Sequence, residues 1–171
     1  MKKVLKAAAL SATVVALSTT AFAGAQEGDL ELNIYGASAQ GTFWTTYAKD
    51  FLKAATNASP APGMGCTKVV EGTATGNAKL GISVGINCAG NNNKNVYIRY
   101  TSNKSVEGPR AVMNQDPQNN DTCPLVDGVD SHRYQAEWNN DESTPVFTKT
   151  CLDVHVGASD VASEAFTQSS K

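Results

Sequence analysis

The chain has 171 residues, of which 41% are hydrophobic and 18% are charged, and its formal net charge at pH 7 is −2. This length predicts a single ordinary domain. The acidic balance, together with the lack of a basic stripe interleaved with aromatic residues, argues against a nucleic-acid partner.

The first 23 residues have the pattern of a secretory signal peptide. Three lysines stand near the start, residues 7–17 form an apolar stretch, and Ala21-Phe22-Ala23 fits a small-x-small cleavage site. A retained N-terminal anchor is the alternative, but the apolar stretch is shorter than the roughly 20 residues of a membrane span. Cleavage leaves residues 24–171 with 11 basic and 16 acidic side chains, a net charge of −5. We therefore expect a periplasmic or secreted protein.

A strand and a helix are predicted next along the chain. Alternation over residues 31–35 predicts a strand that runs into the turn Gly36-Ala37-Ser38-Ala39-Gln40. Residues 42–55 then predict a helix with a stripe of Phe43 or Trp44, Tyr47, Phe51 and Ala55. A breaker region with two prolines follows.

The middle of the chain predicts a hairpin, a second main strand and a short helix. Residues 67–70 and 80–86 have the pattern of two strands around a turn rich in Gly and Thr. Residues 95–100 form the second main strand, which runs into Thr101-Ser102-Asn103-Lys104-Ser105. A helix through Met113 is expected with Gly108 as its cap, because Pro109 suits the first helical position.

The last third of the chain predicts a long insertion and then a third strand. Residues 115–150 are rich in Asn, Asp, Pro and Gly and show no helical pattern. We expect His132-Arg133-Tyr134 in a solvated loop, with part of a binding edge as the alternative. Residues 151–156 predict a strand with Leu152, Val154 and Val156 on one face, followed by Gly157-Ala158-Ser159-Asp160 and the start of a helix. Three strands thus end in turns of small and hydroxyl residues. In a parallel sheet such turns meet at one edge, where open α/β sheets bind ligands.

All four cysteines lie after the signal peptide, and an even number in an exported chain predicts two disulfides. Three pairings are possible. We favour Cys66–Cys88 and Cys123–Cys151, because each closes one loop-rich excursion. Zinc binding is the alternative, but there is no C-x-x-C motif and neither histidine is spaced near a cysteine. No metal site is therefore expected.

The sequence lacks the motifs of the common enzyme classes. Ser159 follows a strand as in a nucleophile elbow, but Val161 stands where that motif needs glycine, and no histidine follows. No dinucleotide-binding or Walker motif is present. We expect no catalytic residues, no cofactor and no enzymatic activity, and His155 is expected to be structural.

Three motifs, in the same order, resemble those of bacterial periplasmic phosphate-binding proteins, the substrate-binding components of phosphate ABC importers. The run from Leu32 to Ala39, followed by Tyr47-Ala48-Lys49, is similar to the strand, G-A-x-A-[ST]-F and Y-x-K that open that family. The run from Tyr100 to Gly108 fits its second motif, and Gly157-Ala158-Ser159-Asp160 is identical to its third. The chain departs from the family at Gln40-Gly41, which replaces [ST]-F. The similarity covers roughly residues 30–55, 95–114 and 151–166.

The resemblance implies an α/β fold for residues 24–171: the parallel-sheet N-terminal part of one lobe of a type II periplasmic binding protein. Disulfide-tied insertions would occupy about residues 57–94 and 115–150. The family's second lobe has no counterpart, so we expect either further chain or a partner against the open sheet edge.

The resemblance also implies an oxyanion site. Ser105 would donate its hydroxyl to the ligand, Asp160 would accept a hydrogen bond from the ligand's own proton, and the first turn would contribute Ser38 and Gln40. An ionised carboxylate has only acceptors, so it repels a fully ionised anion and makes a charge-assisted bond with a protonated one. Asp160 would therefore favour phosphate over sulfate. A plain helix N-cap is the alternative for Asp160.

The function expected from these motifs is that of an exported, monomeric solute-binding protein. It would bind phosphate or a related oxyanion and deliver it to the membrane subunits of an ABC importer. The alternative is a secreted interaction protein of the same fold without ligand transport.

Overall fold

The computed structural model describes residues 24–115, 117, 123 and 132–160. These residues form seven strands and two α-helices, with short 3-10 turns at Ser38–Gln40 and Ala89–Asn91. The elements are β1 (Leu30–Ala37), α1 (Gly41–Lys53), β2 (Cys66–Thr73), β3 (Leu80–Cys88), β4 (Lys94–Asn103), α2 (Glu107–Val112), β5 (His132–Trp138), β6 (Phe147–Asp153) and β7 (Val156–Ala158).

Five strands form one mixed sheet in the order β2-β3-β4-β1-β7. Strand β1 is parallel to both β4 and β7, whereas β2, β3 and β4 are antiparallel neighbours. The α/β class, the parallel pairing of the first two main strands and the β2–β3 hairpin predicted from the sequence are therefore confirmed. The hairpin supplies two of the five strands of the sheet, so residues 66–88 are not an insertion beside it.

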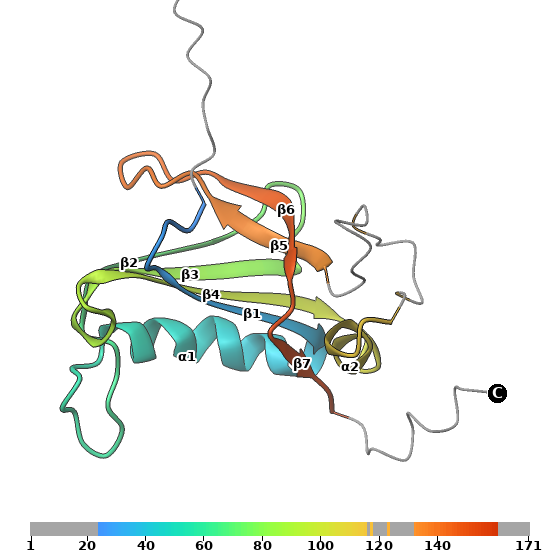
Figure 1. Cartoon of the computed structure of the whole chain (residues 1–171), viewed down its shortest axis with the longest axis horizontal. Coiled ribbons are helices and arrows are strands. Elements are labelled where there is room, and N and C mark those ends of the chain that lie inside the picture. Colours follow the sequence, from blue (N-terminus) through green and yellow to red (C-terminus); the bar gives the residue numbers. More distant parts are fainter. Residues whose placement is uncertain (1–23, 116, 118–122, 124–131, 161–171) are drawn as a thin grey trace, which may run out of the picture.

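Helix α1 covers one face of this sheet (Figure 1). Its buried residues Ala48 and Leu52 pack in a core with Ile34 of β1 and Ile98 of β4. The aromatic stripe expected to define the helix lies elsewhere. Phe43, Tyr47 and Phe51 are 53%, 55% and 45% exposed. The expectation was therefore wrong for these three residues, because Ala48, Leu52 and the partly buried Trp44 face the sheet instead.

The antiparallel hairpin of β5 and β6 covers the opposite face of the sheet (Figure 1). Trp138 and Phe147, paired at its closed end, pack with Val84 and Tyr97 of the main sheet. The polar run 115–150 therefore contains a strand and most of another, where only an irregular insertion was expected. Burial of this hairpin against the sheet overrides its polar composition.

Arg99 of β4 lies between the two sheets, where its side chain is 0% exposed. Its guanidinium donates to both carboxylate oxygens of Glu137 at 2.9 and 2.8 Å, and to Oε2 of Glu31 at 2.6 Å. Further bonds join it to Oδ1 of Asn33 and to the carbonyl oxygen of Ala136. The buried charge is thus paired and hydrogen-bonded, as burial of a guanidinium requires.

Strand β5 also corrects the expectation for His132-Arg133-Tyr134. These residues begin β5, and Arg133 is 1% exposed, donating to the carbonyl oxygens of His132 and Gln115. The segment is therefore a buried strand and not a solvated loop.

The third predicted strand is divided between the two sheets. Residues up to Asp153 belong to β6, and the chain re-enters the main sheet only at Val156. His155 lies between them: its backbone N–H donates to the carbonyl oxygen of Asn33, and its Nδ1 accepts from the N–H of Asn33. His155 thus holds the crossing point against β1, in agreement with the structural role expected for it.

The two disulfides are Cys66–Cys88 and Cys123–Cys151, the pairing favoured from the sequence. The first joins β2 to β3 at directly paired positions, and the second ties Cys123 to β6. Such bonds are typical of an oxidising compartment. In the described ranges, no helix has the length and apolar character needed to cross a membrane. The signal peptide predicted at residues 1–23 and the helix predicted after Asp160 lie outside the described residues.

Candidate oxyanion site

The three turns that follow β1, β4 and β7 meet at one edge of the sheet. The Ser38 hydroxyl donates to the carbonyl oxygen of Asn103 at 2.8 Å, and Nε2 of Gln40 donates to the carbonyl oxygen of Ser159 at 3.0 Å. The Ser105 hydroxyl donates to Oδ1 of Asp160. The convergence of the three turns is therefore confirmed, and all four site residues predicted from the sequence lie at this edge.

Close backbone packing at two glycines brings the turns together. At Gly36, where φ is +138°, a Cβ would lie 2.0 Å from the carbonyl oxygen of Ala158. At Gly108, a Cβ would lie 2.4 Å from the carbonyl oxygen of Tyr35 and 2.6 Å from that of Ala158. The start of α2 therefore sits directly on the ends of β1 and β7, which only residues without a side chain allow.

The Ser105–Asp160 pair is accessible. Asp160 is exposed and Ser105 is half-buried. Within the described part of the chain, the second carboxylate oxygen of Asp160 accepts no hydrogen bond. Because the Ser105 hydroxyl donates to Oδ1, it orients the carboxylate and leaves Oδ2 to accept a hydrogen bond from another molecule.

Tyr100 forms the base of this edge. Its hydroxyl donates to the carbonyl oxygen of Ala37, and its ring stacks on Trp44 with centroids 6.4 Å apart. Burial raises the pKa of Tyr100 to about 12, and the negative charge of Asp160 adds to this rise. The phenol therefore stays neutral at physiological pH and remains a hydrogen-bond donor.

The two helix starts at this edge differ in charge. Helix α1 begins after Gln40 with no side-chain cap and no acidic residue in its first turn. Helix α2 carries Glu107, fully buried, in its first turn. Because a carboxylate already complements the positive end of α2, an added anion is better placed at the start of α1, whose N–H groups lack a side-chain acceptor.

The four predicted residues differ in how their side chains are used. The side chains of Ser38 and Gln40 donate to backbone carbonyl oxygens of the other two turns and so hold the three turns together. The side chains of Ser105 and Asp160 form a pair at the surface. Sequence reasoning missed Tyr100 and Glu107 as parts of this edge. The aromatic residue before the second turn was a signal for Tyr100, but Glu107 gave none, since its burial depends on how α2 packs against β1 and β7.

No cluster of three or more His, Cys, Asp or Glu side chains suited to a metal ion occurs among the described residues. Comparisons of the chain with models of protein families, with curated protein sequences and with solved structures found no match.

Proposed function

We propose that this protein is an exported solute-binding protein that binds phosphate or a related oxyanion at the edge formed by Ser105, Asp160 and the start of α1. The observation that carries the proposal is the Ser105–Asp160 hydrogen bond at the meeting point of three strand-end turns. Ligands of open α/β sheets bind at such an edge.

The chemistry of the pair favours an oxyanion that keeps a proton. Oδ2 of Asp160 accepts the ligand's O–H, while backbone N–H groups in the first turn of α1 donate to the ligand's other oxygens. The N–H of Gly41 is not one of them, because it donates to the carbonyl oxygen of Ser38. A fully ionised anion gains the second set of bonds but is repelled by the carboxylate. Phosphate is therefore preferred to sulfate, and the three sequence motifs support a role in delivering it to an ABC importer.

The expected affinity is modest. Each charge-assisted hydrogen bond contributes about 1.5–3 kcal/mol net. Three or four of them must offset roughly 4 kcal/mol or more of lost translational and rotational freedom. The remainder corresponds to a dissociation constant of about 1 mM.

Isothermal titration of the purified protein with phosphate tests the proposal. We expect saturable binding that weakens about tenfold in Ser105→Ala, because the Asp160 carboxylate loses the charge-assisted bond that orients it towards the ligand. The matched control Thr46→Ala, a surface hydroxyl on α1, should bind like the wild type. Absence of phosphate binding in the folded protein would refute the proposal.

A second candidate, a secreted interaction protein of the same fold, is favoured by one observation. The exposed stripe of Phe43, Tyr47 and Phe51 carries aromatic area that the described residues do not cover. Exposed apolar patches often mark contact with another protein. The phosphate titration separates the two candidates. If the protein is an interaction protein, we expect no phosphate binding and no effect of Ser105→Ala.

A further inference from the structure

A pocket of about 270 Å³ lies between α1 and strands β2 and β3, on the sheet face opposite the β5–β6 hairpin. It exists because small residues face the helix there. A Cβ at Gly81 would reach only ordinary contact distance, 3.4 Å, from Cγ2 of Thr45. A methyl group would therefore fit at Gly81 in ordinary contact with its neighbours, and the glycine leaves that volume to the pocket.

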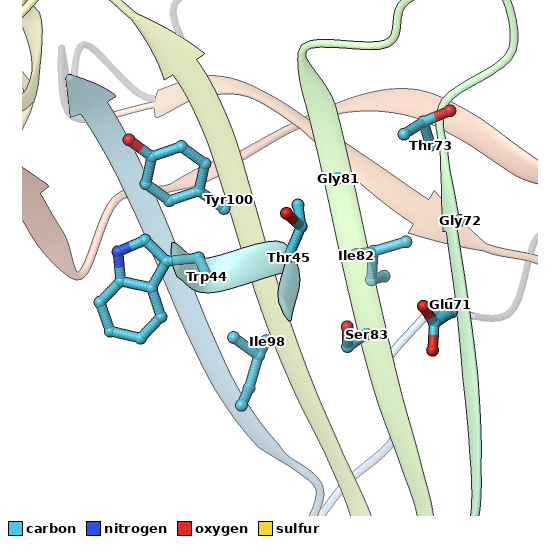
Figure 2. Close-up of a pocket in the computed structure, with 10 residues that line it drawn as sticks. All are labelled: Trp44, Thr45, Glu71, Gly72, Thr73, Gly81, Ile82, Ser83, Ile98 and Tyr100. Carbon is cyan, nitrogen blue, oxygen red and sulfur yellow. The ribbon is translucent and has the colours of Figure 1, made fainter. Parts of the chain in front are cut away.

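The pocket has an aromatic side and a polar side. Figure 2 shows the rings of Trp44 and Tyr100 on one side, and Glu71 and Thr73 of β2 on the other. The two rings are stacked, with an angle of 18° between their planes. Apolar walls with a few placed polar groups are typical of small-molecule sites, and this volume suits a molecule of one aromatic ring.

Ser83 gives the pocket an unused polar group. It is 5% exposed and lines the pocket, yet its hydroxyl forms no hydrogen bond with the described residues. Nε1 of Trp44 is likewise buried without a hydrogen-bond partner. A buried N–H without a partner costs free energy, and the Ser83 hydroxyl, which lines the pocket, can bond to a polar group supplied from outside the protein.

Charge limits the class of that molecule. Glu71 is the acidic group in the pocket lining, and its carboxylate lies 2.5 Å from Nζ of Lys49 on α1. Since this ion pair already neutralises Lys49, nothing in the lining favours a negative charge. The pocket is thus chemically unlike the Ser105–Asp160 edge, although Tyr100 lies between the two.

We propose that this pocket is a second ligand site, for a small aromatic alcohol or amine. The ring of the ligand packs against Trp44 and Tyr100, and its hydroxyl or amino group bonds to the Ser83 hydroxyl. An amine also gains from the Glu71 carboxylate.

Protein NMR with three probes of equal ring size tests the proposal: benzyl alcohol, benzylamine and benzoate. The indole N–H of Trp44 reports on the pocket, and that of Trp138, on the other face of the sheet, is the internal control. We expect saturable shifts at Trp44 with dissociation constants of about 1 mM for the alcohol and the amine. Benzoate should bind about fivefold more weakly or not at all, because no cation among the described residues lines the pocket to offset the desolvation of its carboxylate.

Two variants and a control locate the binding. Gly81→Val fills the open floor and should abolish the Trp44 shifts, while Ser83→Ala keeps the shape and should weaken benzyl alcohol about tenfold. Thr46→Ala, on α1 but outside the pocket, should change neither. If Gly81→Val does not fold, Ser83→Ala decides alone.

The proposal is overturned if none of the probes gives a saturable Trp44 shift, which would mean that the pocket holds only water. It is also overturned if folded Gly81→Val binds like the wild type, or if Ser83→Ala has no effect. Phosphate affinity should be unchanged in Gly81→Val, so failure here and failure of the oxyanion proposal are distinguishable.

Discussion

The hydroxyl of Ser105 donates a hydrogen bond to Oδ1 of Asp160, joining two turns that are 55 residues apart in sequence. The turn after β1 reaches both neighbours, through Ser38 to Asn103 and through Gln40 to Ser159. The edge is therefore one connected hydrogen-bonded unit. A substitution in one of its turns should alter the positions of the other two.

Loss of the buried Arg99 charge should destabilise the protein strongly. Arg99→Met leaves the buried Glu137 carboxylate without its partner, at a cost of about 3–5 kcal/mol in unfolding free energy. Lys68→Met is the matched control, because Lys68 and Glu142 form an exposed pair worth less than about 1 kcal/mol. Urea denaturation measures both. Equal effects of the two variants would show that the buried network is not stabilising.

Gly108 should not tolerate a side chain. The Cβ of Gly108→Ala would meet backbone oxygen atoms at 2.4 and 2.6 Å, so we expect a loss of about 2 kcal/mol or more. Gly81→Ala is the control, since its Cβ finds ordinary contact distances and the change should stay within about 1 kcal/mol. Thermal unfolding followed by circular dichroism compares the two variants. A fully stable Gly108→Ala would contradict the close packing of α2 on β1.

Stability should fall in alkaline solution. Burial raises the pKa of both Tyr97 and Tyr100 from 10.0 to about 12. A pKa that is raised by folding adds stability that is fully present below pH 10 and is lost as the pH rises towards 12. Urea midpoints measured through this range should decrease, and the decrease should be smaller in Tyr97→Phe. A midpoint that does not change with pH would exclude this linkage.

The cysteines should all be oxidised. Titration of thiols under denaturing, non-reducing conditions should find none, and a peptide map should recover Cys66–Cys88 and Cys123–Cys151. The Cys66→Ser/Cys88→Ser variant, which opens a loop with a sequence separation of 22, should lose about 3 kcal/mol. Two or more reactive thiols in the wild type would contradict the pairing.

Local patterns predicted the parallel strands and the meeting of their turns. Small and hydroxyl residues after an alternating apolar run predict where a strand ends. Parallel strands then bring these turns to one edge of the sheet. The positions of Ser105 and Asp160 could therefore be predicted. That the Ser38 and Gln40 side chains bond to backbone depends on the separation of the turns, which no local pattern encodes.

Other features depend on contacts between distant segments. The buried face of α1 consists of small residues and Leu52. Because small residues give a weak hydrophobic signal, the pattern of the sequence favoured the aromatic residues of α1 as the buried face. Strand β5 contains the polar residues Arg133, Gln135 and Glu137. They are buried because β5 lies against the main sheet. The pocket above Gly81 exists only through the register of β2, β3 and β4 beneath the helix.

The selectivity of the protein between phosphate and sulfate, compared in wild type and Asp160→Asn, tests the oxyanion proposal most directly. Calorimetry at a pH where phosphate keeps a proton and sulfate has none should show phosphate bound at least about tenfold more tightly by the wild type, the worth of one charge-assisted bond. In Asp160→Asn the preference should disappear, because an amide can donate to either anion, while Asp50→Asn, at an exposed carboxylate on α1, should keep it. Equal binding of the two anions by the wild type, unchanged in Asp160→Asn, would contradict the role proposed for Asp160.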